Sequence, residues 1–152
     1  MSIRTLTAAK LMTTNVVTIP PSETLRTAAV LLDRHHIHCL VVPPIEPGNC
    51  VGVIATKDIV QILCEGETAV LDQLRVADAM STPAVSVQKD FTISDCLRLM
   101  RMSGVRSAPV LDGTTVVGML SFSDILRAIA AEATQDPRGG GAPAEFRVAP
   151  GA

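Results

Sequence analysis

Aromatic and charged residues are both scarce in this sequence of 152 amino acids. It contains no tryptophan or tyrosine and three phenylalanines, which argues against a protein that stacks single-stranded bases on aromatic side chains. Charged residues make up 18% of the chain and leave a net charge of −2. Because nucleic acid binding relies on an excess of lysine and arginine, this balance also argues against a nucleic acid partner.

Long hydrophobic runs and paired cysteine motifs are absent as well. The longest stretch without a charged residue runs from residue 11 to 22 and contains two prolines, whereas a membrane-spanning helix needs about 20 successive apolar residues. The N-terminus lacks the features of a secretion signal. The four cysteines show no Cys-x-x-Cys spacing, which favours reduced thiols. We therefore expect a cytoplasmic protein with no membrane insertion.

Apolar residues are plentiful, at 47% of the chain, and they recur in a duplicated pattern. Shifting the sequence by 68 positions places apolar residues opposite apolar ones. The aligned pairs are residues 9–12 with 77–80, 17–19 with 85–87, 24–25 with 92–93 and 37–38 with 105–106, followed, after a two-residue difference in one turn, by 51–54 with 117–120 and 58–59 with 124–125. Such self-similarity predicts two copies of one structural unit.

Each copy is predicted to fold in the order strand, helix, strand, strand, helix, which indicates an α/β protein of two pseudo-symmetric halves. The elements of the first copy are strand 16–19, a helix from Leu25, strands 37–42 and 51–55, and helix 57–64. Those of the second are strand 85–87, a helix from Ile93, strands 105–111 and 115–120, and helix 124–133. Ser22 and Asp90 are predicted N-caps, Gly104 a left-handed C-cap, and Asp112-Gly113 a hairpin turn.

The repeat divides the chain into residues 1–67, residues 68–134 and a tail of residues 135–152. The tail is rich in Gly, Pro and Ala, and it is predicted to be disordered because it has too little apolar surface to offset the entropy of ordering. A unit of about 60 residues is marginal alone, so we expect the halves to pack on each other. The junction between the halves is the natural place for a small-molecule site.

A small polar cluster stands at the start of the last helix of each copy. The clusters are Thr56, Lys57 and Asp58 in the first copy, and Ser121, Ser123 and Asp124 in the second. Free N–H groups at a helix start attract phosphate, hydroxyls add hydrogen bonds, and a carboxylate suits the two hydroxyls of a ribose. This combination suggests a nucleoside phosphate. The alternative is that Ser121, Ser123 and Asp124 only cap their helix.

The order and duplication of these motifs resemble a tandem pair of cystathionine-β-synthase (CBS) domains, also called a Bateman module. The resemblance covers roughly residues 7–131. Its motifs are the Ala-x-x-Met starts at 9–12 and 77–80, the strand pieces Val-Thr-Ile and Val-Ser-Val, the segment Gly-Val-Arg-Ser-Ala-Pro-Val at 104–110, and the endings Gly-Val-Ile-Ala-Thr-Lys-Asp at 52–58 and Gly-Met-Leu-Ser-Phe-Ser-Asp at 118–124. It implies two β-α-β-β-α repeats packed through their sheets.

In CBS pairs, the ending Gly-h-h-Thr/Ser-x-x-Asp (h, apolar) places the aspartate on a ribose and the hydroxyl near a phosphate. The residues that match it are Gly118, Ser121 and Asp124, with Ser123 as a further phosphate contact. The first copy keeps Gly52 and Asp58 but has Ala55 at the hydroxyl position, where Lys57 would restore attraction for phosphate. The resemblance therefore implies two unequal sites.

The resemblance also implies a basic residue facing the phosphates at the start of the second strand and a polar residue near the base on the first. The residues at these positions are His38 and Arg106 for the phosphates, and Thr18 and Ser86 for the base. The planar fork of an arginine suits phosphate oxygens; the alternative is that Arg106 is a solvated edge residue. His35, His36 and His38 span a helix end and a strand start, so their rings need not converge and no metal site is expected.

These features predict a non-catalytic regulatory module that binds AMP, ADP, ATP or a related adenosyl ligand between two CBS repeats. The family resemblance implies a homodimer, and the output would reach an unknown effector protein in trans. No cofactor is required besides the regulatory nucleotide. The sequence shows no Ser–His–Asp order and no Walker-type loop that would suggest an enzyme. The alternative is an interaction module whose clefts have lost ligand binding and whose task is dimerisation.

Overall fold

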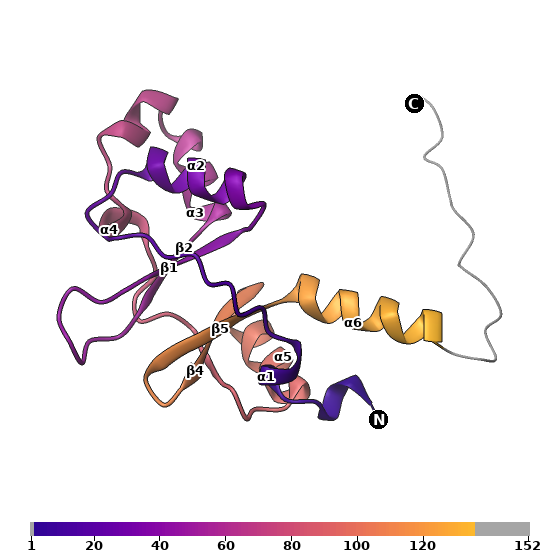
Figure 1. Cartoon of the computed structure of the whole chain (residues 1–152). Coiled ribbons are helices and arrows are strands. Elements are labelled where there is room, and N and C mark those ends of the chain that lie inside the picture. Colours follow the sequence, from indigo (N-terminus) through magenta and orange to yellow (C-terminus); the bar gives the residue numbers. More distant parts are fainter. Residues whose placement is uncertain (1, 136–152) are drawn as a thin grey trace, which may run out of the picture.

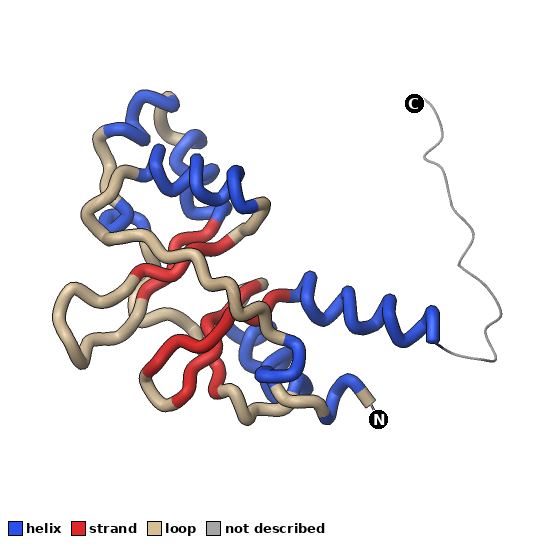
Figure 2. The backbone as a smooth tube through the Cα atoms, in the orientation of Figure 1, coloured by secondary structure: helices blue, strands red, loops and turns tan. Residues whose placement is uncertain are grey.

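The computed structural model describes residues 2–135. The chain forms two lobes, with the strands near the centre of the molecule and the helices outside them (Figure 1, Figure 2). The predicted disordered tail lies outside the described residues except for Gln135. That residue is the last of helix α6 (Phe122–Gln135), which runs out from the end of the second sheet in Figure 1.

The first repeat combines a two-stranded sheet with two α-helices and a 3-10 helix. Its elements are α2 (Leu25–His35), β1 (Cys39–Val42), β2 (Gly52–Ala55), α3 (Thr56–Val60) and the 3-10 helix η2 (Gln61–Cys64). β1 and β2 are antiparallel. The predicted strand 16–19 is reduced to a single parallel bridge between Thr18 and Val41. The predicted helix 57–64 is divided between α3 and η2.

The second repeat has the same order with a more complete sheet. Its elements are β3 (Val87–Gln88), α5 (Ile93–Ser103), β4 (Ser107–Asp112), β5 (Thr115–Ser121) and α6. β3 runs parallel to β4, and β4 runs antiparallel to β5. The predicted hairpin is confirmed, with its turn at Gly113-Thr114, one residue later than predicted, because Asp112 still pairs with Thr115 and Gly113 has a φ of +64°. The predicted α/β class and repeat order are therefore confirmed.

Equivalent threonines cap the starts of α2 and α5. The side chains of Thr24 and Thr92 each accept a hydrogen bond, at 3.2 Å, from the backbone N–H three residues on. The sequence predicted Ser22 and Asp90 as N-caps, and that prediction is wrong. Both lie two residues too early, because the first buried residue of each helix directly follows the threonine.

Both long helices also end in the left-handed conformation. Gly104 has a φ of +70° after α5, which confirms the predicted C-cap. His36 occupies the equivalent position after α2 with a φ of +52°. Histidine is one of the few residues besides glycine found in this region with some frequency.

Each repeat receives part of its core from the other half of the sequence. Helix α1 (Ala8–Leu11) precedes the first repeat, yet Ala8 is fully buried in the core of the second. Helix α4 (Val76–Ala79) precedes the second repeat, yet Val76 is fully buried in the core of the first, as is most of Leu71 in the 3-10 helix η3 (Thr68–Asp72). The two packed units have therefore exchanged their first segments.

Two segments of the chain cross from one lobe to the other, and each pairs with a strand near the crossing. After α1, the chain passes β5, where Thr13 and Met119 exchange two backbone hydrogen bonds of 2.8 and 2.9 Å. After α4, it passes β2, where Ser81 and Val53 do the same at 2.9 and 3.0 Å. We call these two crossings together the seam. Because β2 leads into α3 and β5 into α6, the seam lies beside both helix starts.

Candidate functional site

Asp124 lies beside the seam in the first turn of α6, with its side chain only 6% exposed. Its Oδ2 accepts hydrogen bonds from the backbone N–H and the hydroxyl of Ser121, at 2.8 and 2.9 Å. The Ser121 hydroxyl in turn accepts a hydrogen bond from the backbone N–H of Asp124 at 3.3 Å. This reciprocal arrangement satisfies free N–H groups at the helix start. Ser121 and Asp124 therefore cap the start of α6, and their contribution to a ligand site stays a prediction.

The second oxygen of Asp124 is held by two residues that the sequence analysis did not select. The Thr13 hydroxyl donates to Oδ1 at 3.0 Å, and the Arg127 guanidinium donates at 3.2 Å. A carboxylate has about four acceptor positions, so those of Asp124 are filled. A signal for Thr13 was present, because Thr13 and Ser81 both follow the repeated Ala-x-x-Met motif. No comparable pattern singles out Arg127.

Asp58, the counterpart of Asp124 in α3, is much less engaged. Its Oδ2 accepts a hydrogen bond from the backbone N–H of Ala55 at 2.8 Å, but Ala55 has no hydroxyl to add a second. Ser81, the counterpart of Thr13, makes no side-chain bond to Asp58. Across residues 2–135, no hydrogen bond reaches Oδ1 of this half-buried carboxylate. Asp58 thus accepts one hydrogen bond from the described residues, whereas Asp124 accepts four.

The backbones of the two predicted basic residues, His38 and Arg106, are hydrogen-bonded to the starts of α3 and α6. The carbonyl of His38 accepts a hydrogen bond from the N–H of Thr56 at 2.9 Å, and that of Arg106 accepts one from Phe122 at 3.0 Å. Both side chains are exposed. The structure thus places the backbone of His38 beside Thr56 and that of Arg106 beside Phe122, each at the start of a helix. The exposure of Arg106 also fits the solvated-edge alternative.

The remaining predicted residues are placed without being engaged. Lys57 and Ser123 are exposed in the first turns of α3 and α6, Thr18 is exposed beside β1, and Ser86 is half-buried just before β3. In the described part of the chain, none of these four side chains forms a hydrogen bond to another group. Their contribution to a ligand site stays a prediction.

A thiol lies close to the Asp58 carboxylate. Burial raises the pKa of Cys39 from 9.0 to about 12, and the negative charge of Asp58 adds to the rise. Burial likewise raises the pKa of Cys96 to about 11. Because these pKa values lie above those of the unfolded chain, the protonated thiols favour folding below pH 9, and this stabilisation is lost as the pH rises from 9 toward 12.

Thiol labelling should therefore separate the four cysteines. We expect iodoacetamide at pH 8.5 to modify Cys50 and Cys64, which are exposed, and to spare Cys39 and Cys96 in the folded protein, because the thiolate is the reactive form. Mass spectrometry of the digested protein gives the modified positions, and a sample in urea provides the control in which all four react. Rapid modification of Cys39 without urea would contradict its placement.

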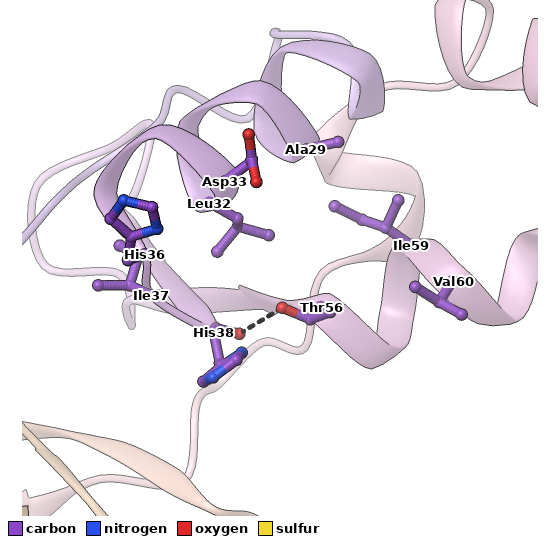
Figure 3. A pocket seen from close by; sticks show the side chains of 9 residues that line it. All are labelled: Ala29, Leu32, Asp33, His36, Ile37, His38, Thr56, Ile59 and Val60. Atoms are coloured by element: carbon purple, nitrogen blue, oxygen red, sulfur yellow. Dashed lines mark hydrogen bonds between the residues drawn. The ribbon is translucent and has the colours of Figure 1, made fainter. Parts of the chain in front are cut away.

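A cavity of about 440 Å³ opens between α2 and α3, apart from the two aspartates. Its polar lining comes from Asp33, His36, His38 and Thr56, and the Thr56 hydroxyl donates to the backbone carbonyl of His38 at 3.4 Å. Figure 3 shows the His38 ring turned away from Asp33 and α2. Of the predicted site residues, this wall contains His38 and leaves out Asp58 and Asp124. The cavity is therefore distinct from the seam.

Neither a metal centre nor a membrane span is formed by residues 2–135. No group of three or more His, Cys, Asp or Glu side chains there is placed to hold a metal ion. His36 follows the end of α2 and His38 precedes β1, so the histidines are divided between two elements. Within the same residues, every helix is too short or too polar to cross a membrane.

The duplicated fold and its paired aspartates define a tandem-repeat α/β module. The family model of the CBS domain matches it twice, at residues 8–65 and 76–131. The protein belongs to the CBS domain family, as a tandem pair. Proteins of this kind are in general regulatory.

Individual relatives agree with this assignment. The CBS domain-containing protein YhcV of Bacillus subtilis is 30% identical over 115 residues, which cover 75% of this chain and 79% of that protein. The structure of a hexameric CBS-CP12 protein from bloom-forming cyanobacteria has a TM-score of 0.77 at 31% identity, covering 88% of this chain and 76% of that one. The CBS domain pair of protein MJ0100, in complex with 5′-methylthioadenosine and S-adenosyl-L-methionine, shares the fold with a TM-score of 0.71 at 21% identity, covering 83% and 97%.

Proposed function

We propose that this protein binds an adenosine ligand beside the seam and reports its presence to a partner protein in the cytoplasm without catalysing a reaction. The observation that carries the proposal is the pair of equivalent aspartates, Asp58 and Asp124. Each is held by the backbone N–H three residues earlier, where one repeat meets the segment crossing from the other. The adenosine compounds in the CBS pair of MJ0100 support this class of ligand.

The two aspartates differ in what a ribose would have to displace. A ribose hydroxyl can donate to Oδ1 of Asp58 without breaking an internal hydrogen bond. At Asp124 it must first replace Thr13 or Arg127. We infer that the Asp58 site is filled first. This order reverses the one that the missing hydroxyl at Ala55 suggests from sequence.

The remaining predicted residues complete the two proposed sites. Lys57 and His38 would face the phosphates on the Asp58 side, whereas Arg106, Ser121 and Ser123 would do so on the Asp124 side. Following the internal symmetry, Ser86 would lie near the base at Asp58 and Thr18 near the base at Asp124. A ligand that binds one arrangement of the repeats more tightly than another shifts the population toward it, and a partner can read that shift.

Isothermal titration calorimetry with AMP, ADP, ATP, NAD and S-adenosylmethionine tests the proposal. At least one of these should bind, and at about 100 times its Kd it should stabilise the fold by about 2.7 kcal/mol. A panel that releases no heat and leaves the melting temperature unchanged, for a protein that forms a stable dimer, would favour the alternative of a ligand-free dimerisation module. The filled acceptor positions of Asp124 are the observation that keeps this alternative open.

We also propose that two copies of the protein associate through helices α3 and α6. Large apolar side chains are exposed there, with Val60 at 55%, Leu126 at 65% and Ile129 at 51%. Apolar surface of this kind is typical of a protein–protein interface. Pairing of the helices would bury it and leave the seam open to ligand.

The substitution Leu126→Glu should shift a dimer toward monomer, because it places a charge in the apolar contact. Analytical ultracentrifugation at several protein concentrations measures the change. The control is Ile45→Glu, which makes the same kind of replacement at an 82% exposed position in the loop between β1 and β2. Equal dissociation constants for the two variants, or a monomeric parent protein, would count against this interface.

A further inference from the structure

A second groove lies on the opposite repeat from the cavity of Figure 3. It has a volume of about 480 Å³ and is formed by α5 and the 3-10 helix η1 (Ile3–Thr5), which packs beside it near the N-terminus in Figure 1. Its lining residues are Arg4, Ser94, Leu97, Arg98, Arg101 and Met102. None of them belongs to the ligand sites proposed above.

Three arginines of the groove have no carboxylate partner. Three salt bridges occur in the described part of the chain, and none of them involves Arg4, Arg98 or Arg101. Arg4 instead donates to the hydroxyl of Ser94 at 3.2 Å, which fixes η1 against α5. The nearest acid on the helix, Asp95, is exposed and pairs with none of them. A chain with a net charge of −2 thus gathers three unpaired positive charges at one place.

The internal repeat shows that the equivalent helix α2 forms without Arg98 and Arg101. Shifting back by 68 residues, Arg98 corresponds to Val30 and Arg101 corresponds to Asp33 of α2. α2 and α5 have the same length and the same capping. Arg98 and Arg101 are therefore not shared by the two repeats, although α2 carries Arg26 and Arg34 at the positions of Ser94 and Met102.

The groove also offers apolar surface between its charges. Leu97 is half-buried in its wall, and Met102 is 81% exposed at its rim. A small anion would use the guanidinium groups but would leave this surface in water. Arginine and methionine together are characteristic of protein–protein interfaces. From Ser94 to Met102 the helix extends about 12 Å, which is the length of about four residues of an extended peptide.

We propose that this groove binds an acidic segment of a partner protein, with carboxylates on Arg98 and Arg101 and an apolar side chain against Leu97 and Met102. Paired guanidinium groups bind carboxylates through charge-assisted hydrogen bonds. The surface lies apart from the seam, so it can be occupied with or without an adenosine ligand. It would be the place where an effector is held in trans.

Fluorescence anisotropy with a labelled peptide of alternating Glu and Leu tests the proposal. Arg101→Glu should weaken the binding of this peptide at least about tenfold, which corresponds to about 1.4 kcal/mol. The matched control is Arg34→Glu, the same charge change in the last turn of α2 and outside the groove, which should change Kd less than twofold. Arg98→Gln offers a milder variant, and circular dichroism verifies that each one folds.

Two comparison ligands distinguish an acidic peptide site from a site for small anions. A Lys and Leu peptide should not bind, and added salt should weaken the Glu and Leu peptide because exposed charges are screened. Binding that is equal in Arg101→Glu and the parent protein would overturn the proposal. Tripolyphosphate binding in the absence of peptide binding would show a site for small anions and would overturn it as well. Calorimetry of Arg101→Glu with adenosine ligands should match the parent, whichever way the peptide experiment ends.

Discussion

Replacing Gly118 with alanine should destabilise the protein by about 3 kcal/mol, the upper part of the range for overpacked sites. An added Cβ would lie 2.6 Å from the Met12 Sδ and 2.9 Å from the carbonyl oxygen of Thr13. The methionine can move, but the Thr13 backbone is held by its two hydrogen bonds to Met119. The substitution therefore acts on the seam itself.

Gly52→Ala is the matched control at the other crossing. There the new Cβ would lie 3.2 Å from the Met80 Sδ and from the Ser81 carbonyl oxygen, contacts that a small adjustment relieves. We expect a cost of about 1 kcal/mol, the lower end of the same range. Urea denaturation of both variants measures the difference, and equal midpoints would contradict the tighter packing at Gly118.

The aspartates should separate stability from ligand binding. Asp124→Ala removes a buried carboxylate that accepts four hydrogen bonds. A hydrogen bond to a charged group contributes about 1.5–3 kcal/mol to the stability of the fold. Because the freed donors regain water in part, we expect a total loss of about 3 kcal/mol. Asp58→Ala removes one such bond and should cost about 1 kcal/mol, close to the loss of a helix cap.

Ligand affinity should follow the opposite order. Asp58→Ala should weaken the first adenosine ligand at least about tenfold, or about 1.4 kcal/mol, whereas Asp124→Ala should affect mainly a second, weaker site. Calorimetry of both variants, at a temperature where each remains folded, gives the two affinities. A first site that depends on Asp124 and is indifferent to Asp58 would show that the open carboxylate oxygen does not set the order of binding.

The parts of the fold that the sequence predicts well are those set by local residues. Gly104 and Asp112-Gly113 mark their turns because the backbone there needs a left-handed residue. The repeat itself is visible because both copies bury the same faces. The exchange of α1 and α4 between the cores could not be predicted, since it depends on the path of the chain across the seam and the repeat pattern is the same with or without it.

The candidate site shows the same division between local and distant effects. The contact of Ser121 with Asp124 spans three residues and could be anticipated from the motif. Thr13 reaches the same carboxylate from 111 residues away, so only the folded chain brings it there. Thr13 and Arg127 occupy Oδ1 of Asp124, whereas Asp58 has no such partners among the described residues. The motif does not contain this difference, and its missing hydroxyl at Ala55 would instead favour Asp124 as the first site.

We propose that adenosine ligands bind beside Asp58 and Asp124, at the starts of α3 and α6, rather than in the cavity between α2 and α3 or at α5. Amide chemical shifts of the isotope-labelled protein, followed during titration with the tightest ligand of the panel, test it most directly. The first shifts should appear at the N–H of Ala55, which is hydrogen-bonded to Asp58, and those of Ser121 should follow at higher ligand concentration. Shifts confined to the cavity between α2 and α3, or to α5, would contradict it.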